Sequence, residues 1–131
     1  MRGTIMIDTD LRSYLLADQA LSSTVSGVYA LRLPQDTTTT AIVYELGGGH
    51  SSAQVGSMGT VLRYSVTLYV YSPSYQTLRE LSDNIINLLN GMSGPMGSTS
   101  IAGSHVESSI NTYEDELKLY RNIINLTIYT N

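Results

Sequence analysis

Few residues of this sequence combine the types and the spacing that catalysis requires. His50 is followed by Ser51 and Ser52, and a serine beside a histidine can act as a nucleophile with its general base. Such a pair needs a rigid support, whereas the surrounding segment 47–59 contains five glycines and predicts a loop. We therefore interpret His50 as a solvent-exposed loop histidine. A small enzyme that uses this Ser–His pair is an alternative hypothesis, which a mobile loop would exclude.

Three consecutive carboxylates, Glu114, Asp115 and Glu116, are the second feature with chemical potential. A general acid–base pair holds two carboxylates in different environments, so that their pKa values separate. Three carboxylates in a row on a turn are instead typical of a solvated acidic tip. If several copies of the chain were brought together, these tips would create a local negative field.

Metal and cofactor sites are not indicated by the sequence. There is no cysteine, and the two histidines, His50 and His105, have no close metal-ligand spacing. Phosphate-binding, dinucleotide-binding and hydrolase motifs are absent, and glycines 47–49 lack the Lys-Ser/Thr of a P-loop. We therefore expect a non-enzymatic protein without a cofactor and without a metal.

Composition narrows the range of partners. The chain has 131 residues, the size of one ordinary domain, and a formal net charge of −4. Its seven basic residues are scattered, so no basic patch for nucleic acid is predicted. No segment is long and apolar enough to cross a membrane, and residues 1–7 are too short for a signal peptide. We expect one domain, 1–131, that is made in the cytoplasm and does not bind membranes.

The clearest elements lie between residues 59 and 91. Apolar side chains alternate with polar ones along 60–71, which predicts a half-buried strand. Ser72 is the expected N-cap and Pro73 the expected first residue of a helix that Gly91 ends. Its apolar stripe is formed by Leu78, Leu81, Ile85, Leu88 and Leu89.

The remaining elements predict an α+β fold. We expect a first helix over 8–21, capped by Asp8, Thr9 or Asp10, and a strand over 41–46 at the centre of the sheet. Further strands are expected over 27–33, 100–111 and 118–129, and connecting loops over 34–40, 47–59, 92–99 and the acidic turn 112–117. The expected fold is an antiparallel-rich sheet of about four to five strands with two helices packed on one face.

Several segments carry a resemblance to a known family. They are the strand that ends in Leu33-Pro34-Gln35, the Ala41-Ile-Val-Tyr44 strand, and the long strand 63–71 that enters Ser74-Tyr75 and a leucine-rich helix. The closing strand contributes the pair Tyr120-Arg121. In this order and spacing, the chain from Leu11 to Tyr129 resembles the small tail-completion proteins, or tail terminators, of long-tailed bacteriophages. It departs from their pattern at Ser72-Pro73 and in its long glycine-rich segment.

The resemblance implies a structural part of a virion. Members of that family form a hexameric ring that caps the tail tube, stops its polymerisation and joins the tail to the connector of the head. The implied partners are further copies of the chain, the tail tube protein and a head-completion or connector protein, while DNA passes through the ring without specific binding. The implied location is the head–tail interface of the virion, after synthesis in the host cytoplasm. A net negative charge agrees with this role, because an acidic lumen lets DNA slide.

Two groups of residues are our candidates for assembly contacts. The candidate contact residues come from the three loops and are Pro34, Gln35, Asp36, Gly49, His50, Gln54, Val55, Met58, Met92 and Met96. The candidate lumen-facing acids are Glu107, Glu114, Asp115 and Glu116. Two alternatives stay open: a stopper or adaptor ring on the head side, and a ligand-binding module whose site is the face of Tyr69 and Tyr71.

Overall fold

The computed structural model describes residues 7–51 and 62–130 of the chain. These residues form a six-stranded sheet in the order β1-β2-β3-β6-β5-β4, in which only β1 and β2 run parallel. The expected α+β class is confirmed, with six strands rather than four to five and three helices rather than two. Along the chain the elements are α1 Ile7–Ala17, α2 Gln19–Ser22, β1 Val28–Ala30, β2 Ala41–Ser51, β3 Leu62–Ser72, α3 Tyr75–Leu89, β4 Gly94–Met96, β5 Thr99–Glu114 and β6 Leu119–Thr130.

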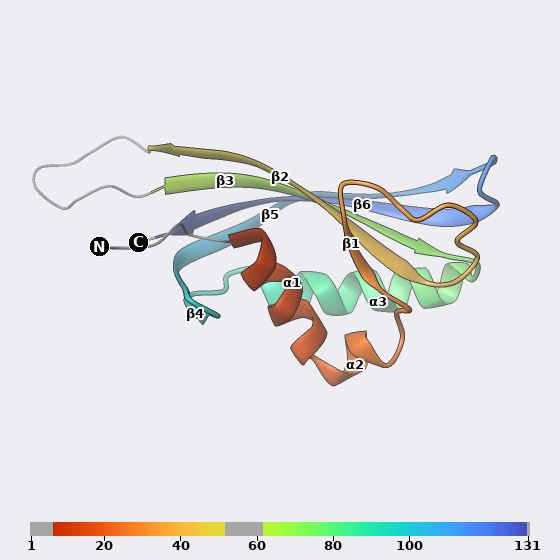
Figure 1. Ribbon diagram of the computed structural model, residues 1–131, viewed down its shortest axis with the longest axis horizontal. Helices are drawn as coiled ribbons and strands as arrows, with labels where there is room; N and C mark the ends of the chain where they lie inside the picture. The colour runs from red at the N-terminus through yellow and green to blue at the C-terminus, as the bar shows by residue number, and fades with distance from the viewer. Residues whose placement is uncertain (1–6, 52–61, 131) are drawn as a thin grey trace, which may run out of the picture.

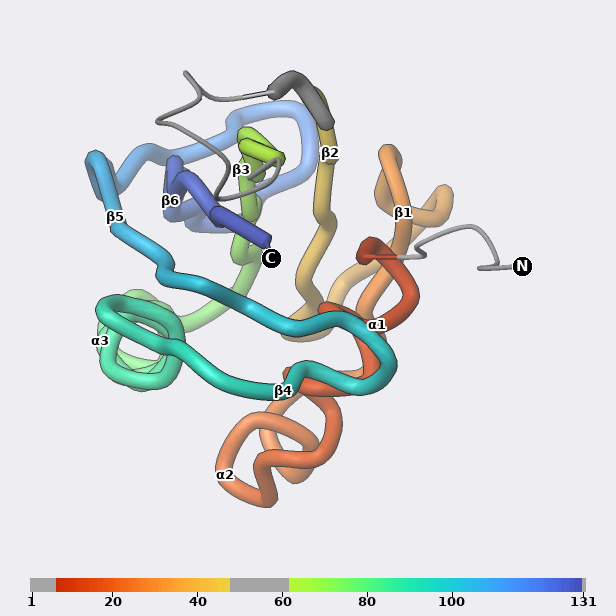
Figure 2. Tube along the Cα trace, turned by 90° about the vertical axis from the view of Figure 1, so that its left-hand side faces the viewer, coloured from red at the N-terminus to blue at the C-terminus, as the bar shows by residue number. Residues whose placement is uncertain are grey.

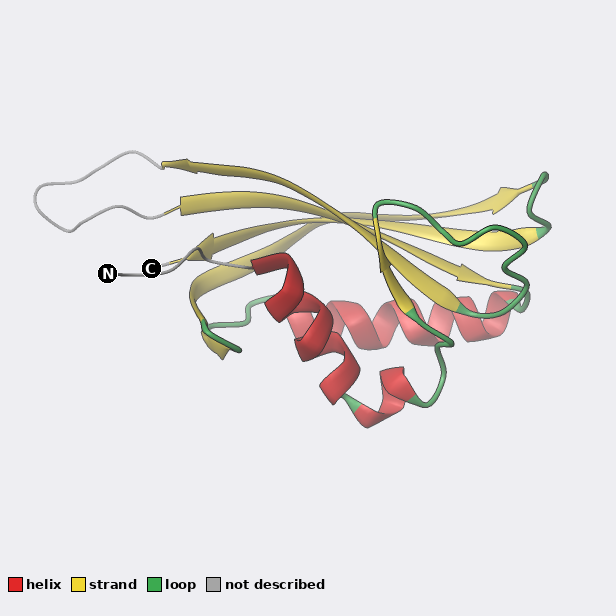
Figure 3. Cartoon of the chain, in the orientation of Figure 1, coloured by secondary structure: helices red, strands yellow, loops and turns green. Residues whose placement is uncertain are grey.

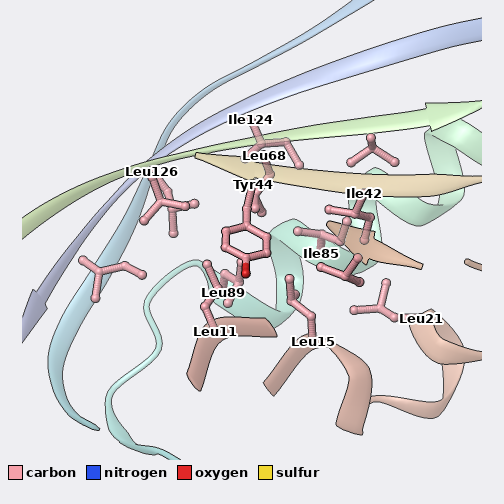
Figure 4. Close-up of a cluster of buried hydrophobic side chains, with 14 of the residues drawn as sticks. Leu11, Leu15, Leu21, Ile42, Tyr44, Leu68, Ile85, Leu89, Ile124 and Leu126 are labelled. Atoms are coloured by element: carbon pink, nitrogen blue, oxygen red, sulfur yellow. The ribbon is translucent and has the colours of Figure 1, made fainter. Parts of the chain in front are cut away.

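All three helices lie on the same side of the sheet, which leaves the other side without a helical layer (Figures 1 and 3). The alternation along β3 sets this division, because its even-numbered residues are buried from Val66 to Ser72, and most of its odd-numbered residues carry more polar side chains. The same holds for β6, where Asn122 and Thr130 are the polar exceptions among its buried, even-numbered residues. Burial of this apolar layer is the main source of stability. Its fully buried members include Leu11, Leu15, Leu21, Ile42, Leu68, Ile85, Leu89 and Ile124 (Figure 4).

The expectation that strand 41–46 occupies the centre of the sheet is wrong. The central pair is β3 and β6, which are hydrogen-bonded along their whole length. β2 lies between β3 and the three-residue strand β1. Its nearly continuous burial over Ala41–Tyr44 arises from β1 on one side and from a small cluster on the far face, where Val43 contacts Tyr71 and Leu119.

The N-terminal helix is interrupted rather than continuous over 8–21. Asp18 adopts an extended conformation (φ −79°, ψ 118°), and its carboxylate accepts a hydrogen bond from the backbone N–H of Leu21 at 3.1 Å. Aspartate is among the favoured N-cap residues, so Asp18 ends α1 and starts α2. Asp8 and Asp10 lie inside the first turn of α1, which begins at Ile7, and so neither they nor Thr9 cap it.

The second predicted helix begins two residues later than expected. Ser74 is the N-cap of α3, and its hydroxyl accepts from the N–H of Thr77 at 3.3 Å. Ser72 is instead the last residue of β3, fully buried, with its hydroxyl 3.1 Å from that of Thr40. Gly91 follows the helix with φ +73°, the left-handed conformation that favours glycine after a C-cap, as predicted.

Three predicted loops are partly strand. The backbone of residues 47–51 continues β2 opposite β3, with an irregularity between Gly48 and His50, because glycine retains both groups needed for a ladder. Residues 94–96 form β4 and pair with the start of β5, through a turn at Gly97 (φ +59°). Glu114 is the last residue of β5, so the acidic turn begins only at Asp115. The rest of the glycine-rich segment, 52–61, lies outside the described residues.

Candidate assembly surfaces

The face of the sheet opposite the helices carries a row of neutral polar side chains. The hydroxyl of Thr67 donates to Oδ1 of Asn125 at 3.0 Å, and Nδ2 of Asn125 donates to the hydroxyl of Ser108 at 3.0 Å. These contacts join β3, β6 and β5 across the strands. The polar groups of this row therefore satisfy one another across the strands, and the row itself carries no formal charge.

Tyr69 and Tyr71 lie at one end of this uncovered face. Tyr71 is 8% exposed and packs with Val43 and Leu119, and the hydroxyl of Tyr69 donates to Oε1 of Glu45 at 3.2 Å. Burial raises the pKa of the Tyr69 hydroxyl, and the Glu45 carboxylate beside it raises the pKa further. Both rings are thus engaged within the chain, which argues against the ligand-binding module that we considered at this face.

The four candidate lumen acids are not brought together in one cluster. Glu107 accepts a hydrogen bond from Thr127 at 3.2 Å and lies 3.7 Å from His105. Glu114 forms an ion pair of 3.1 Å with Arg121. Glu107 and Glu114 are separated by about 23 Å of strand, at roughly 3.3 Å per residue. Asp115 and Glu116 are exposed in the turn between β5 and β6.

The candidate contact residues fall toward opposite ends of the long axis. The connection between β1 and β2, with exposed Pro34, Gln35 and Asp36, extends toward the end where β5 turns into β6 (Figure 1). The end of β2 that contains Gly49 and His50 points the other way, toward the side of β4 (Figure 1). Gln54, Val55 and Met58 lie outside the described residues. Met92 is partly buried, and Met96 is 1% exposed within the core, where its side chain offers no contact surface.

Aromatic rings are stacked at the outer end of β5. Tyr113 contacts Tyr120 edge-on, with ring centroids 4.9 Å apart, and Tyr120 contacts Tyr75 of α3 at 5.4 Å. Tyr113 is nevertheless 49% exposed and Tyr75 44%. The nearby Ile110, on the uncovered face of β5, is 55% exposed. Exposed aromatic side chains that are already held on one side are favourable anchors for a protein interface.

A hollow of about 220 Å³ lies where β1 ends. It is lined by Asp8 of α1, by Ala30 and Leu31, and by Tyr44 and Leu46 of β2. Tyr44 points from β2 toward Leu11 and Leu89 in the core (Figure 4). Burial raises the pKa of the Tyr44 hydroxyl, and the negative charge of Asp8 adds to this increase.

Leu31 at the rim of this hollow is unusual in two respects. Its side chain is 69% exposed, and its backbone has φ +69°, a left-handed conformation that branched and bulky side chains rarely adopt. Strained backbone positions of this kind are often found at functional sites. Sequence reasoning missed this site, because neither glycine nor asparagine marks the left-handed position.

The described residues do not form a metal-binding cluster of acidic, histidine or cysteine side chains. Within the described ranges 7–51 and 62–130, no three side chains of histidine, cysteine, aspartate or glutamate converge as metal ligands would. In the same ranges no helix has the length and apolar character to span a bilayer. The backbone of His50 and Ser51 belongs to β2, and Ser52 lies outside the described residues.

The fold of this chain also occurs in a solved structure of a virion particle. A chain in a solved structure titled "Virion of native gene transfer agent (GTA) particle" superposes with a TM-score of 0.69 at 14% sequence identity, covering 97% of this chain and 98% of that chain. At this identity the match establishes a shared fold.

Family membership follows from the sequence itself. The family described as tail completion protein gp17 matches residues 9–131, and the chain therefore belongs to this family. The comparison with curated proteins gave no match. The predicted resemblance to tail-completion proteins is thus confirmed, and the chain is placed among the structural proteins of phage tails.

Proposed function

We propose that this chain is the tail-terminator subunit of a long-tailed phage or phage-like particle. Six copies form a ring on the end of the tail tube, stop its polymerisation and join the tail to the head connector. The observation that carries this proposal is the family match over residues 9–131, which leaves almost none of the chain for another role.

The two faces of the sheet suggest how the ring is oriented. The helices cover one face, and the other carries the Thr67–Asn125–Ser108 row of neutral polar groups. A channel for DNA must avoid strong attraction for phosphates, because each neutralised phosphate adds to binding. We therefore assign the uncovered face to the lumen and the helices to the outside of the ring.

The carboxylates contribute unequally to this proposed lumen. Glu114 is paired with Arg121, and Glu107 lies beside His105, so their fields are partly compensated. Asp115 and Glu116 are exposed, and among the described residues neither forms an ion pair. They would supply most of the negative potential at one mouth of the ring, where six copies add together.

The loops at the two ends of the long axis then face different partners. Pro34, Gln35 and Asp36 and the acidic turn belong to one end, and Gly49 and His50 to the other. In a closed ring with heterologous contacts, one end faces the last ring of the tube protein and the other faces the connector. This arrangement requires no catalysis and no cofactor.

The test is the mass of the protein in solution, followed by negative-stain imaging with and without tail tubes. A ring of six chains of 14.3 kDa has a mass of about 86 kDa. Rings, free or on tube ends, would support the terminator role. A protein that stays monomeric and ignores tail tubes would overturn it, and a protein found on tail-less heads would indicate a stopper or adaptor ring instead.

A further inference from the structure

Two strands of the sheet have open edges. β1 pairs with β2 only from Ile42 to Tyr44, so from Glu45 onward β2 has no described partner on that side. At the other side of the sheet, β4 pairs with β5 only up to Ile101. The end of α3 then covers a short part of β5, where Gly91 donates to the carbonyl of Ser104 and Val106 donates to Asn90.

The backbone groups at the open edge of β2 can be assigned from its neighbours. The carbonyl of Tyr44 accepts from Leu31 at 2.8 Å, and the N–H of Ile42 donates to Gly27 at 3.1 Å. Because alternate residues of a strand direct their polar groups to the same side, Leu46 and Gly48 direct theirs to the open edge. Among the described residues nothing pairs with them there.

The same reasoning applies to β5. Val106 directs its N–H away from β6 and lies opposite Leu126. Outward and inward direction of the backbone polar groups alternates along a strand. Beyond the irregularity between Val106 and Ser108, the β5 residues that share the outward direction of Val106 are those opposite Ile124, Asn122 and Tyr120. The residues that direct their polar groups outward are therefore Ser109, Asn111 and Tyr113.

Neither open edge carries a proline or a lysine. Proline and lysine, which normally blunt exposed edges, are absent from β2 and from residues 107–114 of β5. Figure 2, which looks along the strands, shows β5 and β2 on opposite sides of the sheet. The two strands run in opposite directions, because β2, β3, β6 and β5 are successively antiparallel. A second copy in the same orientation thus presents its β5 antiparallel to β2 of the first.

We propose that β2 of one copy pairs with β5 of the next, with Tyr113 of the neighbour inserted at the hollow lined by Asp8, Leu31, Tyr44 and Leu46. This rests on the proposed ring, and it names the surface that closes it. Pairing of Leu46 with Tyr113 and of Gly48 with Asn111 satisfies the outward polar groups of both strands. The pairing ends at Glu114, the last residue of the neighbour's β5, and so it does not extend to β1 of the first copy.

The side chains complement one another in this register. The Tyr113 ring rests against Tyr120 on one side and is 49% exposed on the other, and the exposed Leu31 supplies an apolar wall. The carboxylate of Asp8 can accept a hydrogen bond from the hydroxyl of Tyr113. On the opposite face, Gly47 and Thr112 become a non-hydrogen-bonded pair, the kind with the closer backbone approach.

The register also staggers each copy along the strands. Within its own sheet, Leu46 is in register with Val66, Leu126 and Val106. Within the neighbouring copy, Tyr113 is in register with Tyr120. The displacement is six residues of β6 (126 minus 120) per copy. A sheet that closes on itself requires such a stagger, because its strands must tilt relative to the axis.

Disulfide trapping tests this pairing directly, because the natural chain has no cysteine. The variant G47C/T112C should form intermolecular disulfides on mild oxidation, since cysteines in a non-hydrogen-bonded pair meet the distance requirement. Each chain carries both partners, so a non-reducing gel should show a ladder beyond the dimer. The single variants G47C and T112C have no cysteine opposite them in this register and should stay monomeric on the non-reducing gel. The pair G47C/T38C, with Thr38 in the exposed β1–β2 connection, is the mismatched control.

The tyrosine contact is tested with matched substitutions. Tyr113→Ser should raise the concentration needed for half-assembly by about tenfold or more, as expected for an aromatic anchor. Tyr75→Ser removes a ring of similar exposure, 44% against 49%, from the same group of tyrosines and should leave assembly unchanged.

The outcomes separate this proposal from the ring itself. A ladder in G47C/T112C together with the loss in Tyr113→Ser supports the edge pairing. Multimers by light scattering without a ladder, or equal effects of Tyr113→Ser and Tyr75→Ser, overturn the edge pairing and leave the ring intact. A protein that remains a monomer with and without tail tubes overturns both.

Discussion

On the helix-covered face of the sheet, Leu68 and Ile124 lie side by side and are fully buried. On the opposite face, the neighbouring pair Thr67 and Asn125 is joined by a 3.0 Å hydrogen bond and stays partly exposed. Consecutive residues of the same two strands therefore serve different purposes. The comparison indicates that stability resides in one face, so that the other face and the edges are available for assembly.

The largest effect is expected from a truncation on the covered face. Leu68→Ala should lower the free energy of unfolding by about 2–5 kcal/mol, because it removes buried methyl groups and leaves a cavity. Urea unfolding followed by circular dichroism measures it. The matched variant Thr67→Ala, one residue away on the uncovered face, should cost less than about 1 kcal/mol. Equal losses in the two variants would contradict the division between the faces.

The second-largest effect is expected from the hydrogen bonds between α1 and the β4–β5 turn. Asp10 of α1 accepts hydrogen bonds from the hydroxyls of Ser98 at 2.9 Å and Thr99 at 2.5 Å. Asp10→Ala should lower the free energy of unfolding by about 1–2 kcal/mol, since it leaves Thr99 without this acceptor. Ser23→Ala is a control on an exposed hydroxyl that serves only its own helix.

The contribution of Asp10 should also depend on pH. Burial raises the pKa of the Asp10 carboxyl, but the hydrogen bonds from Thr99 and Ser98 outweigh it and bring the pKa below the usual 3.8. The stabilisation is therefore fully present above the pKa of the unfolded chain and is lost as the pH falls through the lower folded pKa. The free energies of unfolding of the natural protein and of Asp10→Asn should converge as the pH is lowered from neutral to pH 3. A constant difference between the two free energies over this range would show that folding is not linked to protonation of Asp10.

A smaller effect is expected in the polar row of the uncovered face. Asn125→Ala removes the acceptor of Thr67 and the donor to Ser108. Both partners can bond to water in a single chain, so we expect a loss below about 1 kcal/mol. Urea unfolding of the monomer is the measurement, and a loss as large as that of Leu68→Ala would refute the assignment of stability to one face.

The smallest effect should come from the acidic turn. Asp115→Asn with Glu116→Gln should change the free energy of unfolding by no more than about 0.5 kcal/mol, because both residues are exposed. If these acids line a mouth of the ring, the same variant should bind short duplex DNA more tightly at low salt once assembled. Unchanged DNA binding by the assembled variant would remove them from the lumen.

The two-residue periodicity of apolar side chains predicted the long strands and their buried faces, because burial largely follows every second residue along β3 and β6. The class, the helix α3 and the long final hairpin could thus be predicted from local sequence. The break at Asp18 carried a recognisable signal, since aspartate is a common N-cap, but a continuous apolar stripe concealed it.

Other features depend on partners that are distant in the sequence. The glycines after Leu46 favour a loop by local preference, yet the N–H and C=O groups of β3 hold them in a strand. The hollow beside Leu31 combines residues of α1, β1 and β2, and no local pattern brings Asp8 to Leu46. The four candidate acids were chosen for their charge, and three of them are consecutive in the chain. Sequence order could not show that Glu107 and Glu114 lie far apart on one strand.

The contact between Asp10 and the β4–β5 turn has a consequence for the synthesis of the protein. Helix α1 leaves the ribosome well before Ser98 and Thr99, which lie 88 and 89 residues further along the chain than Asp10. The β5–β6 hairpin, in contrast, forms from neighbouring residues and needs no such wait. The growing chain therefore carries α1 without its contact to the β4–β5 turn until that turn has also been made. Helix α1 is thus synthesised before this turn but is fixed against it only afterwards.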